Sequence, residues 1–347
     1  MKTLAPVAPP KARLTLNDVA RAMGVSRTTV SNAFNRPEQL SAALREGVLG
    51  KARELGYFGP DPAARAMRRG GIHDVGVVFH HDLRYTLGDP LSLAFLRGVA
   101  KELDARQLNL QLIPKMGRRE QLAAAFQATA DALIVLAEIE PELAPQVEAA
   151  HKPLVLVDAF FAGATMVSVQ DRAGARMAMA HALASAPARV LVLGFPLKGS
   201  ERERILKRKT APRSLYVAGE RLAGYVAEVR ARGFAMEQVT WIEVDERDPE
   251  SAAERIAQWR GELVKGTRLA IVAMSDRMAL AAQQQVAAWT GVTVSAIVGF
   301  DDGPTAEAAG LTTIRQDAFH KGELAVQALL DGVRPAPLAV ELVVRKT

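Results

Sequence analysis

Cationic side chains gather near the start of the chain, where they could bind a polyanion. Residues 1–71 hold twelve Lys or Arg and five Asp or Glu, whereas the rest of the chain holds 32 basic and 33 acidic residues. A basic segment joined to a neutral body favours a module that binds phosphate backbones. On charge alone, a solvated basic surface is the alternative, so the pattern inside the segment has to decide.

Residue types suited to catalysis or metal binding are sparse. The 347-residue chain has no Cys, which excludes disulfides, thiolate metal sites and cysteine nucleophiles, and its six His are scattered. His80 and His81 are adjacent at the end of a predicted strand, so they point to opposite sides and make a poor chelate. The sequence contains no phosphate-binding glycine loop, dinucleotide fingerprint, nucleophile elbow or zinc-protease motif. We therefore expect no enzyme activity, no cofactor and no metal site.

Three short helices are predicted inside the basic segment. Thr15 and Asp18 have the spacing of a capping box, and Gly24 is suited to end the helix that they start. Ser26 is placed to cap a second helix and Ser41 a third. The apolar residues available for the inner faces are Val19, Ala20, Met23, Val30, Ala33, Phe34, Val48, Leu49, Ala52 and Leu55. The short turn between the first two helices is typical of a helix-turn-helix, although a generic three-helix bundle fits the same pattern.

The residues of this segment resemble a known DNA-binding signature. The run Thr-Leu-Asn-Asp-Val-Ala-Arg-Ala-Met-Gly-Val-Ser-Arg-Thr-Thr-Val-Ser-Asn-Ala-Phe-Asn at 15–35 is similar to that of the lactose-repressor (LacI/GalR) family almost position for position. The match resumes at Leu55-Gly-Tyr57. The resemblance implies a sequence-specific transcription regulator whose second helix lies in the major groove of DNA.

The resemblance also implies roles for single side chains. Arg27, Thr28 and Asn32 line up with the variable base-reading positions of the family. Their chemistry fits, because Arg can bond guanine O6 and N7, Asn can pair with adenine, and Thr can touch a thymine methyl. Short hydroxyl side chains suited to phosphate contacts are Thr15, Ser26, Thr29 and Ser31. Thr15 and Ser26 also cap helices, and the two roles can coexist.

A short segment at 60–71, bounded by Pro and Gly, connects the headpiece to the rest of the chain. Its Ala-Ala-Arg-Ala-Met run is a good helix former. By resemblance, it is a hinge helix that orders on the operator and pushes an apolar side chain into the minor groove. Met67 is similar in placement to that wedge, where the family usually has Leu, and the chain carries one extra residue between Tyr57 and the hinge.

From residue 72 onward, apolar runs alternate with amphipathic helical stretches. Strands are predicted at 75–79, 108–113, 132–136, 154–157, 190–193, 239–244, 269–274 and 296–300, and helices at 94–105, 174–183, 218–232 and 251–263. Continuous apolar runs are typical of parallel strands covered on both faces. Repeated strand–helix units predict a doubly wound α/β architecture with two sheets side by side. This matches the two-lobed periplasmic-binding-protein-like core of the resembled family, with crossings expected near Val169, Asp301 and Asp331.

Ligands in such folds bind at strand carboxyl ends, between the lobes. By resemblance, Asp158, Arg221 and Asp301 correspond to residues that hydrogen-bond ligand hydroxyls in sugar-binding members, and Ser275 stands where the family often has Asn. Carboxylates and a guanidinium suit hydroxyls, which donate to one and accept from the other. A structural Asp–Arg network bridging the lobes is the alternative. Further candidates for the lining of this cleft, just past the first strand, are His80, His81 and Tyr85.

Two departures from the family pattern bear on the ligand. The loop after the 239–244 strand reads Asp-Glu-Arg-Asp-Pro and has no aromatic residue, whereas sugar-binding members tend to stack one there. The segment 198–210 is longer and more charged than the usual connection, and we expect a solvated surface loop.

The expected fold class is α plus α/β. We predict a disordered arm at 1–13, a helix-turn-helix domain at 14–59, a hinge helix at 60–71 and a two-lobed effector-binding and dimerisation domain at 72–347. The chain contains no run of about 18 apolar residues and no secretory signal, so a cytoplasmic protein without a membrane span is expected. The leading hypothesis is a repressor that binds a palindromic operator as a homodimer or tetramer and responds to a sugar or related metabolite. Its alternatives are control by a protein co-regulator, constitutive binding, or a solute-binding protein or enzyme on the same core.

Overall fold

The computed structural model divides into two compact units, Met1–Gly71 and Ile72–Thr347. The described residues are 15–35, 39–55, 71–79, 81–113, 130–136, 152–161, 163–197, 199–207, 216–244 and 249–347. Met67, with residues 60–70 of the predicted hinge, and His80 lie outside them.

The described residues of the first unit form three helices: α1 (Leu16–Met23), α2 (Arg27–Asn35) and α3 (Ala42–Leu55). Each begins where the sequence predicts. The carboxylate of Asp18 accepts bonds from the amide and the hydroxyl of Thr15 at 2.8 and 2.7 Å. The hydroxyl oxygens of Ser26 and Ser41 each accept from the amide three residues on, at 3.0 and 3.4 Å. Helix α1 ends at Gly24, whose φ of 65° is open to glycine at little cost.

The core of this unit comes from one face of each helix. Val19, Val30 and Val48 have no exposed surface, and each belongs to a different helix. They pack with Leu16, Ala20, Ala33 and Ala52, while the predicted inner residues Met23, Phe34, Leu49 and Leu55 are partly buried around them. The predicted three-helix headpiece is confirmed.

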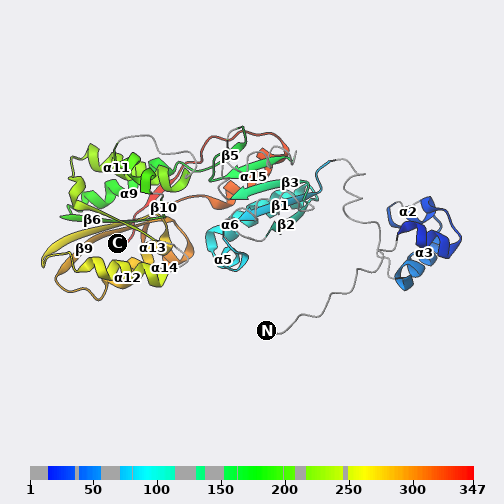
Figure 1. Ribbon diagram of the computed structural model, residues 1–347, viewed down its shortest axis with the longest axis horizontal. Coiled ribbons are helices and arrows are strands. Elements are labelled where there is room, and N and C mark those ends of the chain that lie inside the picture. The colour runs from blue at the N-terminus through cyan, green and yellow to red at the C-terminus, as the bar shows by residue number, and fades with distance from the viewer. Residues whose placement is uncertain are drawn as a thin grey trace. The chain divides into compact units, whose positions relative to one another are not determined.

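The N-lobe of the second unit is built on five parallel strands in the order β2-β1-β3-β4-β5. The strands are β1 (Asp74–Phe79), β2 (Asn109–Ile113), β3 (Ala132–Leu136), β4 (Leu154–Val157) and β5 (Thr165–Val167), and its described helices are α5 (Leu83–Gly88), α6 (Pro90–Ala105) and α15 (Ala318–Leu330). Helices α6 and α15 pack together over one face of this sheet (Figure 1). Helix α15 thus joins the N-lobe although it follows the second lobe in sequence.

The C-lobe holds a six-stranded sheet in the order β11-β10-β9-β8-β6-β7, parallel except for β11. The strands are β6 (Arg189–Gly194), β7 (Val239–Glu243), β8 (Thr267–Ala273), β9 (Val292–Asp301), β10 (Thr312–Arg315) and β11 (Glu341–Val343). The helices are α9 (Asp171–Ala184), α10 (Gly199–Leu206), α11 (Tyr216–Ala231), α12 (Pro249–Arg260), α13 (Asp276–Val286) and α14 (Pro304–Ala309), with a 3₁₀ turn at Met236–Gln238. Helices α9 and α11 cover one face and α12 to α14 the other (Figure 1).

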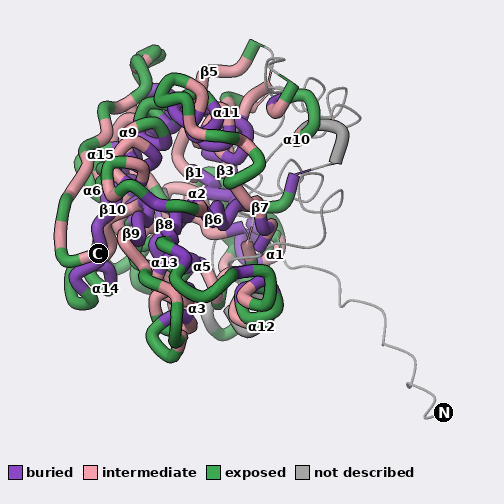
Figure 2. Tube along the Cα trace, turned by 90° about the vertical axis from the view of Figure 1, so that its left-hand side faces the viewer, coloured by how far each residue is buried: buried purple, intermediate pink, exposed green. Residues whose placement is uncertain are grey.

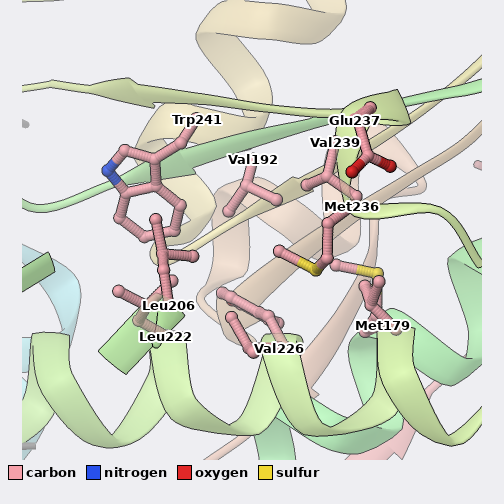
Figure 3. Close-up of a pocket in the computed structure, with 11 residues that line it drawn as sticks. Met179, Val192, Leu206, Leu222, Val226, Met236, Glu237, Val239 and Trp241 are labelled. Atoms are coloured by element: carbon pink, nitrogen blue, oxygen red, sulfur yellow. The ribbon is translucent and has the colours of Figure 1, made fainter. Parts of the chain in front are cut away.

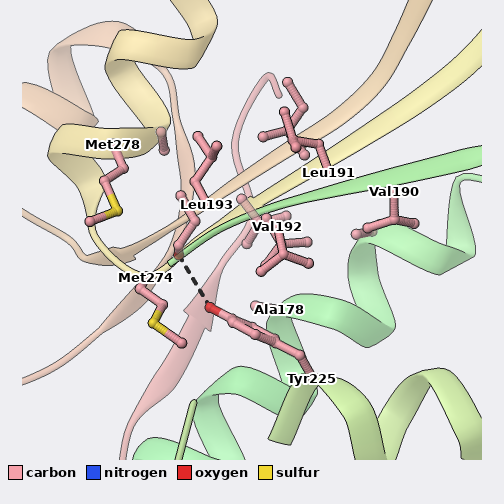
Figure 4. Packing of buried hydrophobic residues seen from close by; sticks show 14 of the residues in the cluster. Ala178, Val190, Leu191, Val192, Leu193, Tyr225, Met274 and Met278 are labelled. Atoms are coloured by element: carbon pink, nitrogen blue, oxygen red, sulfur yellow. Dashed lines mark hydrogen bonds between the residues drawn. The ribbon is translucent and has the colours of Figure 1, made fainter. Parts of the chain in front are cut away.

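The central strands of both sheets are buried on both sides. Figure 2 shows the buried residues in purple along inner strands and the exposed ones in green on outer helices. In the C-lobe, the strand residues Leu191, Leu193 and Ile271 have no exposed surface. Tyr225 is buried beside them, and its hydroxyl donates to the carbonyl of Ala273 at 3.2 Å (Figure 4). The phenol therefore satisfies its polar atom inside an apolar core.

The eight predicted strands are present, and most of their ends agree within a residue or two. The position of one crossing between the lobes differs from the expectation. Strands β9 and β10 belong to the same sheet, so the chain does not leave the C-lobe at Asp301. It leaves after Arg315, at the start of α15. The crossings lie near Val169, near Gln316 and between Asp331 and Leu338, where Leu338 bridges back to Val169. The expectation for Asp301 was wrong because β10 is a short strand that was left out.

The charged segment at 198–210 is also not the loop that we expected. Helix α10 occupies Gly199–Leu206, and its Ile205 is 3% exposed in the C-lobe core. Its charged residues Glu203 and Arg204 are exposed. Among the described residues, no helix is long and apolar enough to cross a membrane.

Candidate functional site

Helix α2 has an apolar side and a polar side. Val30 and Ala33 are buried against α1 and α3, whereas Arg27 and Thr28 are exposed. Asn32 is half-buried, and its amide nitrogen donates to Gln39 at 2.9 Å. A guanidinium, a hydroxyl and an amide on the accessible side of one helix are the groups that bond base edges in a major groove.

The predicted phosphate-binding hydroxyls lie at helix starts. The oxygens of Ser26 and Thr29 are 2.8 Å apart, and Thr29 also donates its amide to Ser26. The hydroxyl of Thr15 donates to Asp18, and this bond lowers the pKa of the carboxyl. Ser31 is half-buried on α2. These hydroxyls cap helices in the structure, and phosphate binding by them stays a prediction.

A polar cluster lies between the two lobes, at the carboxyl ends of strands. We call it the interlobe cluster, and its members are Asp158, Asp171, Arg221, Asp301, Gln316 and Lys321. Three of them, Asp158, Arg221 and Asp301, are residues that the sequence predicts to bind a ligand. Asp158 follows β4 of the N-lobe, and Asp301 ends β9 of the C-lobe. The cluster therefore collects side chains from both lobes, as predicted for a ligand site in a doubly wound fold.

Hydrogen bonds connect the two lobes through this cluster. The ammonium of Lys321 donates to Asp158 at 2.6 Å and to the side-chain oxygen of Gln316 at 2.8 Å. The side-chain nitrogen of Gln316 donates to Asp301 at 2.6 Å. The other carboxylate oxygen of Asp158 is buried and finds no partner among the described residues. The second carboxylate oxygen of Asp171 is likewise buried without a partner among the described residues, so two acceptors of the cluster are left over for further donors.

Arg221 has partners on every side. Its Nε donates to Asp171 at 2.8 Å, its Nη1 donates to the carbonyl of Met274, and its plane lies 3.5 Å from the ring centre of Phe300. Burial raises the pKa of Asp171 to about 6, although Arg221 pulls it down. Burial alone would lower the pKa of Arg221, but the carboxylates of Asp171 and Asp301 raise it and keep the guanidinium charged. The partners of Arg221 all belong to the C-lobe, so its network differs from the lobe-bridging one considered as the alternative, and ligand binding by Arg221 stays a prediction.

The backbone is strained where the carboxylates emerge. Asp158, Asp301 and Asp302 have φ of 53°, 129° and 60°, a region that non-glycine residues rarely adopt. Such strain persists only where the surroundings hold it, and it concentrates at binding sites. Here Asp302 is held by Arg315 and Arg345 at 2.7 and 2.6 Å. The strained turn after β9 presents Asp301 to the interlobe cluster.

Ser275 and Asp276 begin helix α13 beside this turn. Ser275 is 2% exposed, and its hydroxyl accepts from the amide of Met278 at 3.4 Å. The carboxylate of Asp276 accepts from the amide of Gly303 at 3.0 Å and from the hydroxyl of Thr313. Burial raises the pKa of Asp276 to about 6. Ser275 thus caps α13 and Asp276 holds the turn after β9, and a ligand contact by Ser275 stays a prediction.

The aromatic residues after β1 meet the other lobe. The rings of His81 and Tyr85 are 4.4 Å apart, and the guanidinium of Arg277 on α13 lies 4.8 Å from the centre of the Tyr85 ring. This cation–π contact joins the lobes at a second place.

Sequence reasoning missed Asp171, Gln316 and Lys321 as members of the cluster. Lys321 carried a usable signal, because it is a charge on a helix face formed otherwise by small and apolar residues such as Ala318 and Ala325. Asp171 carried none, since a carboxylate in the first turn of a helix is common in any protein.

An apolar cavity of about 320 Å³ lies elsewhere, inside the C-lobe. Figure 3 shows it between α11 and the strands β6 and β7, with Met179, Met236, Val226 and Trp241 around it. None of the residues predicted to bind a ligand lines it.

Comparisons with known proteins agree with both parts of this geometry. The model of the bacterial regulatory proteins of the lacI family matches residues 15–59, and that of the periplasmic binding protein-like domain matches residues 204–347. The HTH-type transcriptional regulator Rv3575c of Mycobacterium tuberculosis is 34% identical over 347 residues, which cover 96% of this chain and 95% of that protein.

Two solved structures share the fold. The lac repressor dimer bound to operator and the anti-inducer ONPF has a TM-score of 0.67 at 23% identity, with 96% of this chain and 98% of that chain covered. The complex of the regulator CelR with cellobiose has a TM-score of 0.61 at 23% identity, with 96% and 99% covered.

A helix-turn-helix headpiece joined to a two-lobed α/β core defines a DNA-binding transcriptional regulator. The chain belongs to the lacI family of bacterial regulatory proteins. Its relatives are regulators of transcription and not enzymes.

Proposed function

We propose that this regulator is a repressor that binds a palindromic operator as a homodimer and responds to a small polyhydroxylated effector at the interlobe cluster. The observation that carries the proposal is the cluster itself. Asp158 of one lobe and Asp301 of the other are connected in it by hydrogen bonds through Lys321 and Gln316. A ligand that bonds to both carboxylates would favour one arrangement of the lobes over another. The lac repressor dimer on its operator supports the dimer.

On the DNA side, the proposed base contacts are Arg27, Thr28 and Asn32 of α2. The proposed phosphate contacts are Thr15, Ser26, Thr29 and Ser31, and the proposed minor-groove wedge is Met67. Exposure of Arg27 and Thr28 on the polar side of α2 supports the first set. In a dimer, two such helices held at a fixed spacing would read the two half-sites of one operator.

On the effector side, hydroxyl groups suit the chemistry of the cluster. Asp158 and Asp301 offer carboxylate acceptors, and the further proposed contacts are Arg221 and Ser275. The charged side chains of the cluster are three carboxylates and two cations, so an uncharged ligand is favoured over an anion. The CelR–cellobiose complex supports a sugar or a related metabolite.

Control by a protein co-regulator is the second candidate. It is favoured by the contacts of Arg221, whose Nε and Nη1 already donate to Asp171 and to the carbonyl of Met274. A cluster whose hydrogen bonds already link the two lobes would then serve as a structural bridge, with the signal arriving at a surface.

One titration separates the two candidates. A selection from randomised duplexes with the full chain yields the operator, and a panel of sugars and polyols is then titrated into the complex while release is followed by fluorescence anisotropy. We expect one compound to release the wild-type chain. Asp301→Ala should bind the operator as wild type does and stop responding, whereas Asp104→Ala, an exposed change on α6, should respond normally. Release of Asp301→Ala at the wild-type concentration would contradict the assignment, and no response to any compound favours the co-regulator.

A further inference from the structure

Lys321 is a charged residue on an apolar helix face. It lies on α15 with Ala318, Ala325 and Val326, which are buried, and is itself only 3% exposed. Burying an ammonium is costly unless strong partners compensate for the lost water. The partners of Lys321 should therefore indicate why a lysine is present there.

Those partners belong to different parts of the second unit. Asp158, at 2.6 Å from the ammonium, ends a strand of the N-lobe, and Gln316, at 2.8 Å, lies in the crossing between the lobes. The side-chain nitrogen of Gln316 in turn donates a hydrogen bond to the carboxylate of Asp301 in the C-lobe at 2.6 Å. Three successive hydrogen bonds thus run from one lobe to the other, and Lys321 makes two of them.

The position of Lys321 is fixed relative to the N-lobe. Its neighbour Gly322 lies against α6 so closely that a Cβ there would be 2.2 Å from the carbonyl oxygen of Phe95. Gly98 of α6 lies equally close to α15, where a Cβ would be 1.9 Å from the carbonyl oxygen of Phe319. Since backbone touches backbone, α15 moves with the N-lobe as one body. A movement of the C-lobe must therefore break the bonds at Gln316.

We propose that Lys321 is a positioning residue that holds the two lobes at one separation in the absence of a ligand. Asp158 anchors its ammonium in the N-lobe, and Gln316 extends its hold to Asp301 in the C-lobe. Its link to regulation rests on the proposed function, because an effector that bonds to Asp158 and Asp301 competes with Lys321 for the first carboxylate and with Gln316 for the second. The holding role itself needs no effector.

The separation of the lobes can be measured directly, since the chain has no Cys of its own. Nitroxide labels at Arg97→Cys on α6 and Ala227→Cys on α11, both exposed helical positions in different lobes, report the interlobe distance by pulsed electron resonance. The full chain is used without ligand and is diluted with unlabelled protein, so that both labels of a pair belong to one chain. We expect a single narrow distance distribution for the wild-type background.

Two variants break the connection at different bonds. Lys321→Met keeps the length of an apolar side chain on the buried face, and the carboxylate of Asp158, 28% exposed, can turn to water. Gln316→Met keeps the Lys321–Asp158 pair and removes the bonds of Gln316 to Lys321 and to Asp301, so it covers the case in which the first variant fails to fold. In each variant we expect the distribution to broaden and to shift from the wild-type distance.

Lys101→Met is the matched control. Lys101 also lies at the α6–α15 contact and pairs with Glu323 of α15, but its side chain is 62% exposed and reaches only the N-lobe. It should leave the distribution unchanged. Wild-type distributions for both Lys321→Met and Gln316→Met would overturn the proposal, as would equal broadening by Lys101→Met. A failure to find any effector would count against the proposed function and would not alter this result.

Discussion

At the scale of single residues, the partners of a side chain decide what it can do. Arg221 was predicted from its motif as a ligand contact, yet the structure pairs it with Asp171 and the carbonyl of Met274 and stacks it on Phe300. These partners come from three other segments of the chain. The residues next to Arg221 in the sequence include none of these partners, so the sequence could not distinguish a ligand-binding arginine from a structural one.

The Asp171–Arg221 pair should be important for stability. Asp171→Ala leaves a buried guanidinium without its counter-ion, and such losses cost about 3–5 kcal/mol. Arg172→Ala is the control one residue on, since it breaks the exposed Arg172–Glu220 pair, for which about 0–1 kcal/mol is expected. Urea denaturation of the two variants gives the comparison, and similar costs would show that the buried pair has no special weight.

Asp276 predicts a pH dependence. Because burial raises its pKa to about 6 in the folded chain, the folded state holds a proton that the unfolded state has already lost between about pH 4 and 6. The free energy of unfolding therefore falls as the pH rises through this window and is flat above it. Asp276→Asn removes this contribution, so the variant should gain on the wild type by about 2 kcal/mol between pH 4.5 and 7.

Denaturant titrations at both pH values test this expectation, with Asp104→Asn as an exposed control that should follow the wild type. A constant difference between wild type and Asp276→Asn across the window would mean that Asp276 is ionised as readily when folded as when unfolded.

Arg27 is the base-reading residue whose loss is easiest to interpret. It is exposed on α2, and a bidentate contact with guanine contributes about 1–3 kcal/mol of discrimination. Arg27→Ala should weaken operator binding by that amount and relax the preference at one symmetric pair of positions. Selections from randomised DNA with both chains give the comparison, and identical site preferences would contradict the contact. Arg21→Ala, an exposed cation on α1, serves as the charge-matched control.

At the scale of elements, close helix packing transmits position. Helices α6 and α15 touch at Gly98 and Gly322, where any side chain would collide with backbone. Helix α15 follows the C-lobe strand β10 in sequence but is bound to the N-lobe by this contact. The contact therefore fixes the positions of both the crossing segment before α15 and the ammonium of Lys321 relative to the N-lobe.

Gly322→Ala should disrupt this element. The new Cβ would stand 2.2 Å from the carbonyl oxygen of Phe95, so the helix has to move, at a cost of about 1–3 kcal/mol or more. Gly88→Ala, at the end of α5 in the same lobe, meets nothing within 4 Å and should change the thermal midpoint little. Thermal unfolding followed by circular dichroism compares the two. Equal midpoints would mean that α15 can shift away from α6 at no cost.

At the scale of the whole molecule, regulation requires the core to influence how the headpiece binds DNA. The proposed wedge Met67 belongs to the predicted hinge at 60–71 and tests that connection. Met67→Ala should lose affinity for the operator while binding random duplexes as before, because a wedge contributes only where the DNA is bent. Band shifts on operator and random DNA measure the specific and the non-specific affinity separately. Equal losses on both would assign Met67 to packing.

The sequence by itself determined the local features of this protein. Helix starts at Thr15, Ser26 and Ser41 depend on side chains three residues apart, and the long buried strands depend on continuous apolar runs, so both are visible in a short window. The polar side of α2 followed in the same way. The short strands β5, β10 and β11 were missed, because three residues, or four that read Thr-Thr-Ile-Arg, lack the continuous apolar run that marks β4.

The tertiary structure alone decided the interlobe cluster. Lys321 and Asp158 are 163 positions apart, and Arg221 and Asp171 are 50 apart, so no local pattern could join them. The strain at Asp158 and Asp301 likewise exists only where distant segments hold the backbone in place. Burial makes these pairs necessary, since a charge removed from water must find its partner wherever the fold brings one.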